Sequence, residues 1–238
     1  MKTFSTFFLE RLTMSPFRIR MSISKIILMV MLGSGFLMNF AAAAGIGELC
    51  SGSISLSEGQ WARFALDAPL IKNRIDSRYA IVGTEGSDYW MEFEIATPMG
   101  NGSTIMKVLI PSWPYAEGAV KRVMMQLPTI EGMDGMPPME MPPSSMRNND
   151  VAEPIRMACT ELEKGVEESL TVTAGTFNTT RIPLRSLAKD IWLSSDVPFG
   201  LVKMADTDDK GMELMAFGSD AEPGITAEPQ QIPGMDSQ

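Results

Sequence analysis

The chain has 238 residues, and its 29 acidic side chains outnumber its 20 lysines and arginines, so the formal net charge is −9 at pH 7. It contains no histidine, which removes the usual base at neutral pH and the commonest ligand of zinc and copper(II). Two cysteines are too few to hold a structural zinc ion or an iron–sulfur cluster. The acidic balance argues against a phosphate-binding surface, so nucleic acid is not an expected partner.

Residues 1–44 have the features of a signal peptide. Lys25 precedes an apolar run from Ile26 to Phe40, and an alanine run with an A-x-A cleavage pattern follows. The apolar run is shorter than the about 20 residues that a membrane span needs. The alternative is an N-terminal anchor that is not cleaved. A start at Met21 would give a signal of ordinary length, so this methionine is an alternative start of translation.

Removal of the leader makes the chain more acidic. The mature protein keeps 15 basic and 28 acidic residues, a net charge of −13. Its length suits one domain, which we place at residues 45–221. No second apolar stretch is long enough to span a bilayer, so we expect a periplasmic or secreted protein without a stable membrane span.

Both cysteines, Cys50 and Cys159, remain in the mature chain. In an oxidising compartment, one even pair indicates one disulfide. Closing a loop of about 110 residues would contribute about 4 kcal/mol on the chain-entropy model. The alternative is lipidation of Cys50, but residues 47–49 do not match the small-residue pattern that a lipoprotein signal places before its cysteine.

Alternation of apolar and polar residues indicates that most of the mature chain is β-strand. The clearest case is residues 89–97, where Tyr89 and Met91 share one face and Trp90 and Glu92 the other. Strands and turns at this spacing predict an antiparallel sheet, sandwich or open barrel. The expected strands are residues 61–66, 78–85, 89–97, 104–110, 119–127 (with a helix as the alternative), 169–174, 176–184, 190–193, 199–204 and 211–217.

One amphipathic helix is expected from Asp150 to Lys164. Asp150 can cap its start, Pro154 lies in the first turn where its missing N–H costs little, and Gly165 can end it. Cys159 lies on the apolar stripe, so the disulfide would tie the N-terminal segment to the buried side of the helix. The predicted fold class is therefore α+β, mostly β: a curved antiparallel sheet or open half-barrel packed on one or two helices.

Two stretches carry no strand or helix pattern. Residues 128–150 form a long proline-rich loop, and residues 222–238 form a tail that we expect to be disordered. Thioether sulfur is a soft ligand that selects Cu(I), so methionines in the loop could bind this ion. The alternative is that they are adaptable apolar contacts covering the sheet or a partner. The loop methionines are Met133, Met136, Met139, Met141 and Met146.

The aromatic residues offer a second candidate site. As walls of an open barrel they would line a cavity for an apolar ligand, and otherwise they are core and sheet-face residues. No combination of side chains indicates catalysis, because the S-x-x-K match at residues 186–189 lacks its companion motifs. We therefore expect no catalytic residue and no cofactor other than Cu(I) in the alternative reading. The candidate ligand-binding aromatics are Trp61, Phe64, Trp90, Phe93 and Trp192.

Several local patterns have a familiar form. Residues 59–64 (GQWARF) resemble the opening strand of uncharacterised exported bacterial β-rich proteins. In those proteins a G-T-F motif follows later, and a longer pattern comes after it. Here residues 175–177 match the G-T-F motif and residues 192–203 (WLSSDVPFGLVK) match the longer pattern. Their layout is similar to the half-barrel of periplasmic lipoprotein carriers. The resemblance implies a curved antiparallel sheet that wraps helices and shields an acyl chain. It carries over no ligand-binding residue, and the methionine- and proline-rich loop departs from the carrier pattern.

The sequence thus predicts an exported, non-enzymatic binding protein for an apolar ligand such as a lipid or a lipoprotein acyl chain. One alternative is a Cu(I)-binding protein that uses the loop methionines. Another is a structural or interaction module of the cell envelope, with an envelope protein as its partner.

Overall fold

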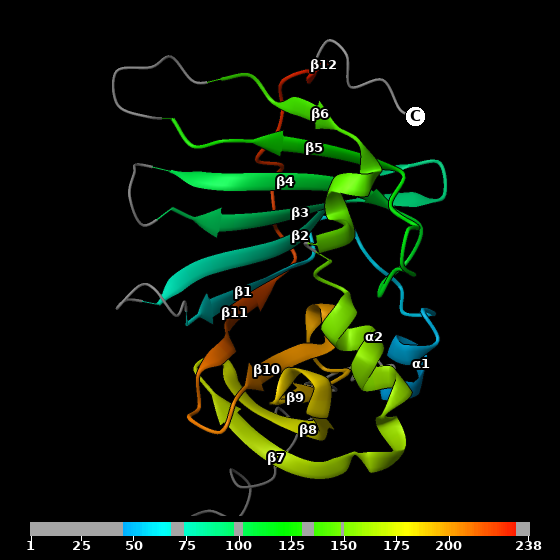
Figure 1. The fold of residues 1–238 in the computed structure, drawn as a ribbon, viewed down its shortest axis with the longest axis vertical. Coiled ribbons are helices and arrows are strands. Elements are labelled where there is room, and N and C mark those ends of the chain that lie inside the picture. The colour runs from blue at the N-terminus through cyan, green and yellow to red at the C-terminus, as the bar shows by residue number, and fades with distance from the viewer. Residues whose placement is uncertain (1–44, 68–73, 98–101, 130–135, 149, 232–238) are drawn as a thin grey trace, which may run out of the picture. The chain divides into compact units, whose positions relative to one another are not determined.

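The computed structural model describes residues 45–67, 74–97, 102–129, 136–148 and 150–231 (Figure 1). The predicted signal peptide, its cleavage site, Met133 and residues 232–238 lie outside the described residues.

The described residues form one sheet of twelve strands, in the order β12-β6-β5-β4-β3-β2-β1-β11-β10-β9-β8-β7. Neighbours are antiparallel, except that β12 runs parallel to β6. Strands β1 to β6 succeed one another across one half of the sheet, and β7 to β11 cross the other half and return to β1. The strands are β1 (Trp61–Leu66), β2 (Ile75–Glu85), β3 (Asp88–Ala96), β4 (Ser103–Ile110), β5 (Arg122–Gln126), β6 (Met139–Met141), β7 (Val166–Val172), β8 (Gly175–Leu184), β9 (Lys189–Leu193), β10 (Leu201–Ala205), β11 (Gly211–Gly218) and β12 (Gln230–Gln231).

The predicted fold class is confirmed. The sheet is open, with β7 and β12 as its edges within the described residues, and helices α1 (Ile46–Cys50) and α2 (Glu153–Thr160) pack on it (Figure 1). Residues 119–127, for which a helix was the alternative to a strand, contain strand β5. The expected loop at residues 128–150 contains β6 and the 3-10 helix η2 (Pro143–Asn148), which alternation could not reveal because both elements are too short to show a period.

The predicted helix at residues 150–164 is shorter than expected. The carboxylate of Asp150 accepts a hydrogen bond from the backbone N–H of Ala152 at 3.0 Å, and α2 begins only at Glu153. The helix ends at Thr160, and a separate 3-10 turn (η3, Leu162–Lys164) follows. Asp150 therefore shapes the turn before the helix instead of capping the helix itself.

The inner face of the sheet, on which α1 and α2 pack, holds the main core. Its aromatic residues form a row across three neighbouring strands: the Tyr79 ring lies 5.1 Å from Phe64 and 5.0 Å from Phe93. Burial raises the pKa of the Tyr79 hydroxyl, which therefore stays neutral. Trp113, in the segment after β4, and Phe199, before β10, close over this row. Side chains thus fill the middle of the inner face.

Residues 219–231, which we call the C-terminal strap, lie on the outer face of the β1–β6 half of the sheet. The strap crosses the strands from β11 towards β6 (Figure 1). Glu92 is only 1% exposed, and its carboxylate accepts the backbone N–H groups of Gly224 at 2.7 Å and Ile225 at 3.0 Å. The Nζ atom of Lys107 donates to the carbonyl oxygen of Ile225 at 3.2 Å. Residues 222–231 of the tail thus lie against the sheet, where the Glu92 carboxylate satisfies two of their backbone N–H groups.

Among the described residues, we find no helix with the length and apolar character that crossing a bilayer requires.

Candidate functional site

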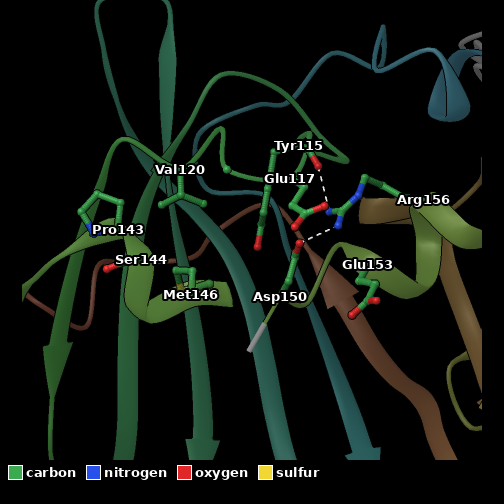
Figure 2. A pocket seen from close by; sticks show the side chains of 10 residues that line it. Tyr115, Glu117, Val120, Pro143, Ser144, Met146, Asp150, Glu153 and Arg156 are labelled. Atoms are coloured by element: carbon green, nitrogen blue, oxygen red, sulfur yellow. Dashed lines mark hydrogen bonds and ion pairs between the residues drawn. The ribbon is translucent and has the colours of Figure 1, made fainter. Parts of the chain in front are cut away.

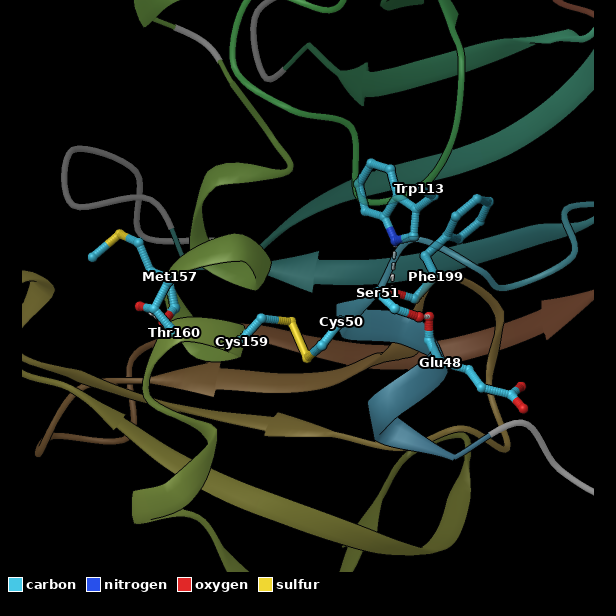
Figure 3. Close-up of a disulfide and its surroundings, with 8 residues drawn as sticks. All are labelled: Glu48, Cys50, Ser51, Trp113, Met157, Cys159, Thr160 and Phe199. Atoms are coloured by element: carbon cyan, nitrogen blue, oxygen red, sulfur yellow. Dashed lines mark hydrogen bonds between the residues drawn. A yellow bond between two sulfur atoms is a disulfide. The ribbon is translucent and has the colours of Figure 1, made fainter.

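The two cysteines form a disulfide, as predicted. Cys50 ends α1 and Cys159 lies in the last turn of α2, with their Cα atoms 5.2 Å apart (Figure 3). The bond joins residues that are 109 positions apart in the sequence. It fixes α1 beside α2, where Leu49 packs in the core against Gly200, a residue whose φ of 76° favours glycine. The disulfide thus holds the helical cover on the inner face.

The structure does not bring the five candidate aromatics together. Phe64 and Phe93 lie buried on the inner face, whereas Trp61 and Trp90 lie on the outer face with the strap. Trp192, between two buried neighbours on β9, is half-buried against the main core cluster, and its Nε1 donates to Glu168 at 2.6 Å. Strand alternation divides the set between two faces. Ligand binding by any of these residues stays a prediction.

Methionines gather instead on the inner face, at the end of the sheet formed by β4, β5 and β6. Strand pairing places Met106 opposite Met125, and Met125 opposite Met139, so one row of thioethers crosses three strands. Met141 occupies the next row, opposite the buried Val123. All four methionines are half-buried. We call this set, Met106, Met125, Met139 and Met141, the methionine surface.

Only half of this surface could be found from the sequence. Met139 and Met141 belonged to the predicted loop set, but Met106 and Met125 did not, because pairing between distant strands cannot be read from alternation. Of the other loop methionines, Met136 is 49% exposed and Met146 is buried. The described members of the predicted metal set thus differ in exposure, and Cu(I) binding by them stays a prediction.

A polar pocket of about 270 Å³ (Figure 2) is lined by Pro143 and Ser144, which follow Met141 of this surface in the chain. It lies between the segment after β4, the 3-10 helix η2 and the start of α2. Met146 lines it and also belongs to the apolar core cluster against which Met106 and Met141 pack. The side chains that give the pocket its character are Tyr115, Glu117, Met146, Asp150, Glu153 and Arg156.

The tyrosine in this pocket is unusual. Tyr115 is 1% exposed, and within the described part of the chain its hydroxyl oxygen has no hydrogen-bond partner. Figure 2 shows the phenol pointing into the space beside Asp150. Burial, and after it the charge of Asp150, raise the pKa of Tyr115, so the hydroxyl is neutral at every physiological pH.

The arginine in the pocket is already paired. Arg156 donates to the carboxylate of Asp150 at 2.6 Å and to the backbone carbonyl oxygen of Tyr115 at 3.0 Å (Figure 2). Burial lowers the pKa of Arg156, because it disfavours the charged form. The hydrogen bond and the charge of Asp150 have a larger opposite effect, so this pKa lies above its ordinary value. In the ranges that the structure describes, no group of three or more acidic, histidine or cysteine side chains could hold a metal ion.

No family model, curated protein or solved structure matches the chain. The resemblance to lipoprotein carriers therefore stays a prediction.

Proposed function

We propose that the protein is an exported, non-enzymatic binding protein that holds an apolar chain, such as a lipid acyl chain, on the methionine surface. The observation that carries the proposal is the row of half-buried thioethers formed by Met106, Met125 and Met139 on three neighbouring strands. Methionine has three rotatable bonds and a polarisable sulfur, so such a surface adapts to chains of varied shape. Export is supported by the leader-like N-terminus and by the disulfide.

The arrangement of the core determines where the chain would lie. The middle of the inner face is occupied by Trp113, Tyr115 and Phe199, which are at most 1% exposed. A ligand therefore binds at the β4–β6 end, where the apolar side chains are half-buried, without unpacking the core. This position differs from the aromatic cavity that we expected from the sequence.

The first experiment identifies and localises the ligand. The mature protein is purified from the periplasm, its organic extract is analysed by mass spectrometry, and the emptied protein is titrated with a fluorescent fatty acid. Replacing Met125 by Gln keeps the side-chain length but removes about 1 kcal/mol of apolar contact, so we expect affinity to fall about fivefold. Met215→Gln on β11 is the matched control and leaves affinity unchanged. An empty protein that takes up no probe would exclude the carrier function.

Binding of Cu(I) is the second candidate function. Directly opposite residues on neighbouring strands have Cβ atoms about 4.5–5.5 Å apart, so the flexible thioethers of Met106, Met125 and Met139 can converge on one soft ion. Competition against a Cu(I) chelator tests this site, with Met106→Ile and Met125→Ile as variants that keep an apolar side chain. Affinity that is the same in both variants as in the native protein would rule it out.

A further inference from the structure

We infer that the ligand is a single-chain amphiphile whose polar end is a protonated primary amine, and that this ammonium group occupies the Tyr115 pocket. The inference rests on the proposed function, because it assigns the polar end of the chain that lies on the methionine surface. The pocket adjoins that surface, since Pro143, which lines it, comes two residues after Met141.

Charge favours a cation in the pocket. Three carboxylates line it, and its one guanidinium, that of Arg156, is engaged by Asp150. Glu117 and Glu153 are exposed and form no ion pair with any described side chain. An ammonium group entering the pocket meets two carboxylates that have no ion-pair partner among the described residues, whereas a carboxylate or phosphate would be repelled by them.

Hydrogen bonding favours a primary amine among cations. A buried hydroxyl without a partner costs about 1–3 kcal/mol, and Tyr115 has an oxygen in this state pointing into the pocket. An ammonium group carries three N–H donors on a compact charge. One can reach the Tyr115 oxygen while the others face Glu117 and Glu153. A quaternary ammonium has the positive charge but no N–H donor. Comparing it with a primary amine therefore separates the contribution of charge from that of hydrogen bonding.

A chain-matched series tests the inference. Dodecylamine, dodecanol, dodecyltrimethylammonium and dodecanoate are titrated into the emptied mature protein by calorimetry, each below its micelle concentration. We expect dodecylamine to bind at least tenfold more tightly than dodecanol, trimethylammonium to lie between them, and dodecanoate to bind most weakly. High salt should reduce the preference for the amine, since it screens the exposed carboxylates.

Variants locate the amine. Tyr115→Phe keeps the ring and removes only the unpartnered hydroxyl, and the Glu117→Gln, Glu153→Gln double variant removes the two carboxylate charges that form no ion pair. Each should bring the affinity for dodecylamine towards that for dodecanol and leave the dodecanol affinity unchanged. Glu167→Gln on β7 is the control for a lost surface charge and should have no effect.

The outcomes separate this inference from the function on which it rests. Equal affinity for the amine and the alcohol, or tighter binding of dodecanoate, would overturn the amine assignment and leave the apolar-chain function standing. Failure of all four ligands to bind would overturn the proposed function itself.

Discussion

The indole Nε1 of Trp113 donates a hydrogen bond to the backbone carbonyl oxygen of Phe199 at 2.9 Å, and the two rings meet edge to face with centroids 5.6 Å apart (Figure 3). The residues lie 86 positions apart and come from opposite halves of the sheet. This contact joins the segment after β4 to the segment before β10 over the centre of the inner face. It explains why the core is filled there and why the proposed binding surface lies towards the sheet end.

Trp113→Phe should lower the free energy of unfolding by about 2–4 kcal/mol. The substitution leaves the buried carbonyl of Phe199 without its partner and creates a cavity, and the two costs add. Urea denaturation of the mature protein measures the change. Phe217→Leu, at an exposed position on β11, is the control and should change stability by less than about 1 kcal/mol.

Loss of the disulfide should destabilise the protein without altering the sheet. We expect a Cys50→Ser, Cys159→Ser double variant to lose about 2–4 kcal/mol of stability, because the cross-link closes a loop of more than a hundred residues in the unfolded chain. Thermal unfolding of native and variant protein, each with a far-ultraviolet circular dichroism spectrum, measures both quantities. A variant as stable as the native protein would contradict the structural role of the bond.

The C-terminal strap depends on Glu92. Replacing it by Ala removes the acceptor for two backbone N–H groups and leaves the half-buried Lys107 without its ion-pair partner, so we expect a loss of about 2–4 kcal/mol. Hydrogen exchange at Gly224 and Ile225 should accelerate more than exchange in β2. Glu94→Ala on the same strand is the control, since it removes only a partly exposed pair with Arg78 and should cost at most about 1 kcal/mol.

Asp67 should contribute to the acid sensitivity of the fold. Hydrogen bonds from Arg74, and after them from the backbone N–H of Gly211, lower the pKa of Asp67 below its ordinary value of 3.8. A lowered folded-state pKa means that the contribution is fully present above the unfolded pKa and is lost as pH falls through the folded pKa. The Asp67→Asn variant should therefore be less stable than the native protein at neutral pH. When the pH falls below about 4, the free energy of unfolding of the variant should decrease less than that of the native protein. Urea denaturation of both proteins at neutral and acidic pH measures how much the free energy of unfolding of each one changes with pH.

Strand positions and face assignments could be predicted from the sequence because alternation is a local property. Residues 61–66 coincide with β1, and the alternation of Tyr89 and Met91 with Trp90 and Glu92 matches the two faces of β3. The disulfide could be predicted from the even number of cysteines and from the expected export to an oxidising compartment.

The candidate site could be predicted only in part because it depends on long-range pairing. Nothing local indicates that Met106 lies opposite Met125, or that Arg156 of α2 meets the carbonyl oxygen of Tyr115. The strap was missed for a similar reason: its polar, proline-bearing composition resembles a disordered tail, and the groups that hold it, such as Glu92 and Lys107, lie on distant strands.

The most direct test of the account is nuclear magnetic resonance of the mature protein labelled with ¹³C at the methionine methyl groups, titrated with dodecylamine. We predict that the signals of Met106, Met125 and Met139 shift with the ligand while that of Met215 on β11 stays in place. Shifts confined to methionines of β10 and β11, or a spectrum that saturating ligand leaves unchanged, would contradict the placement of an apolar chain on this surface.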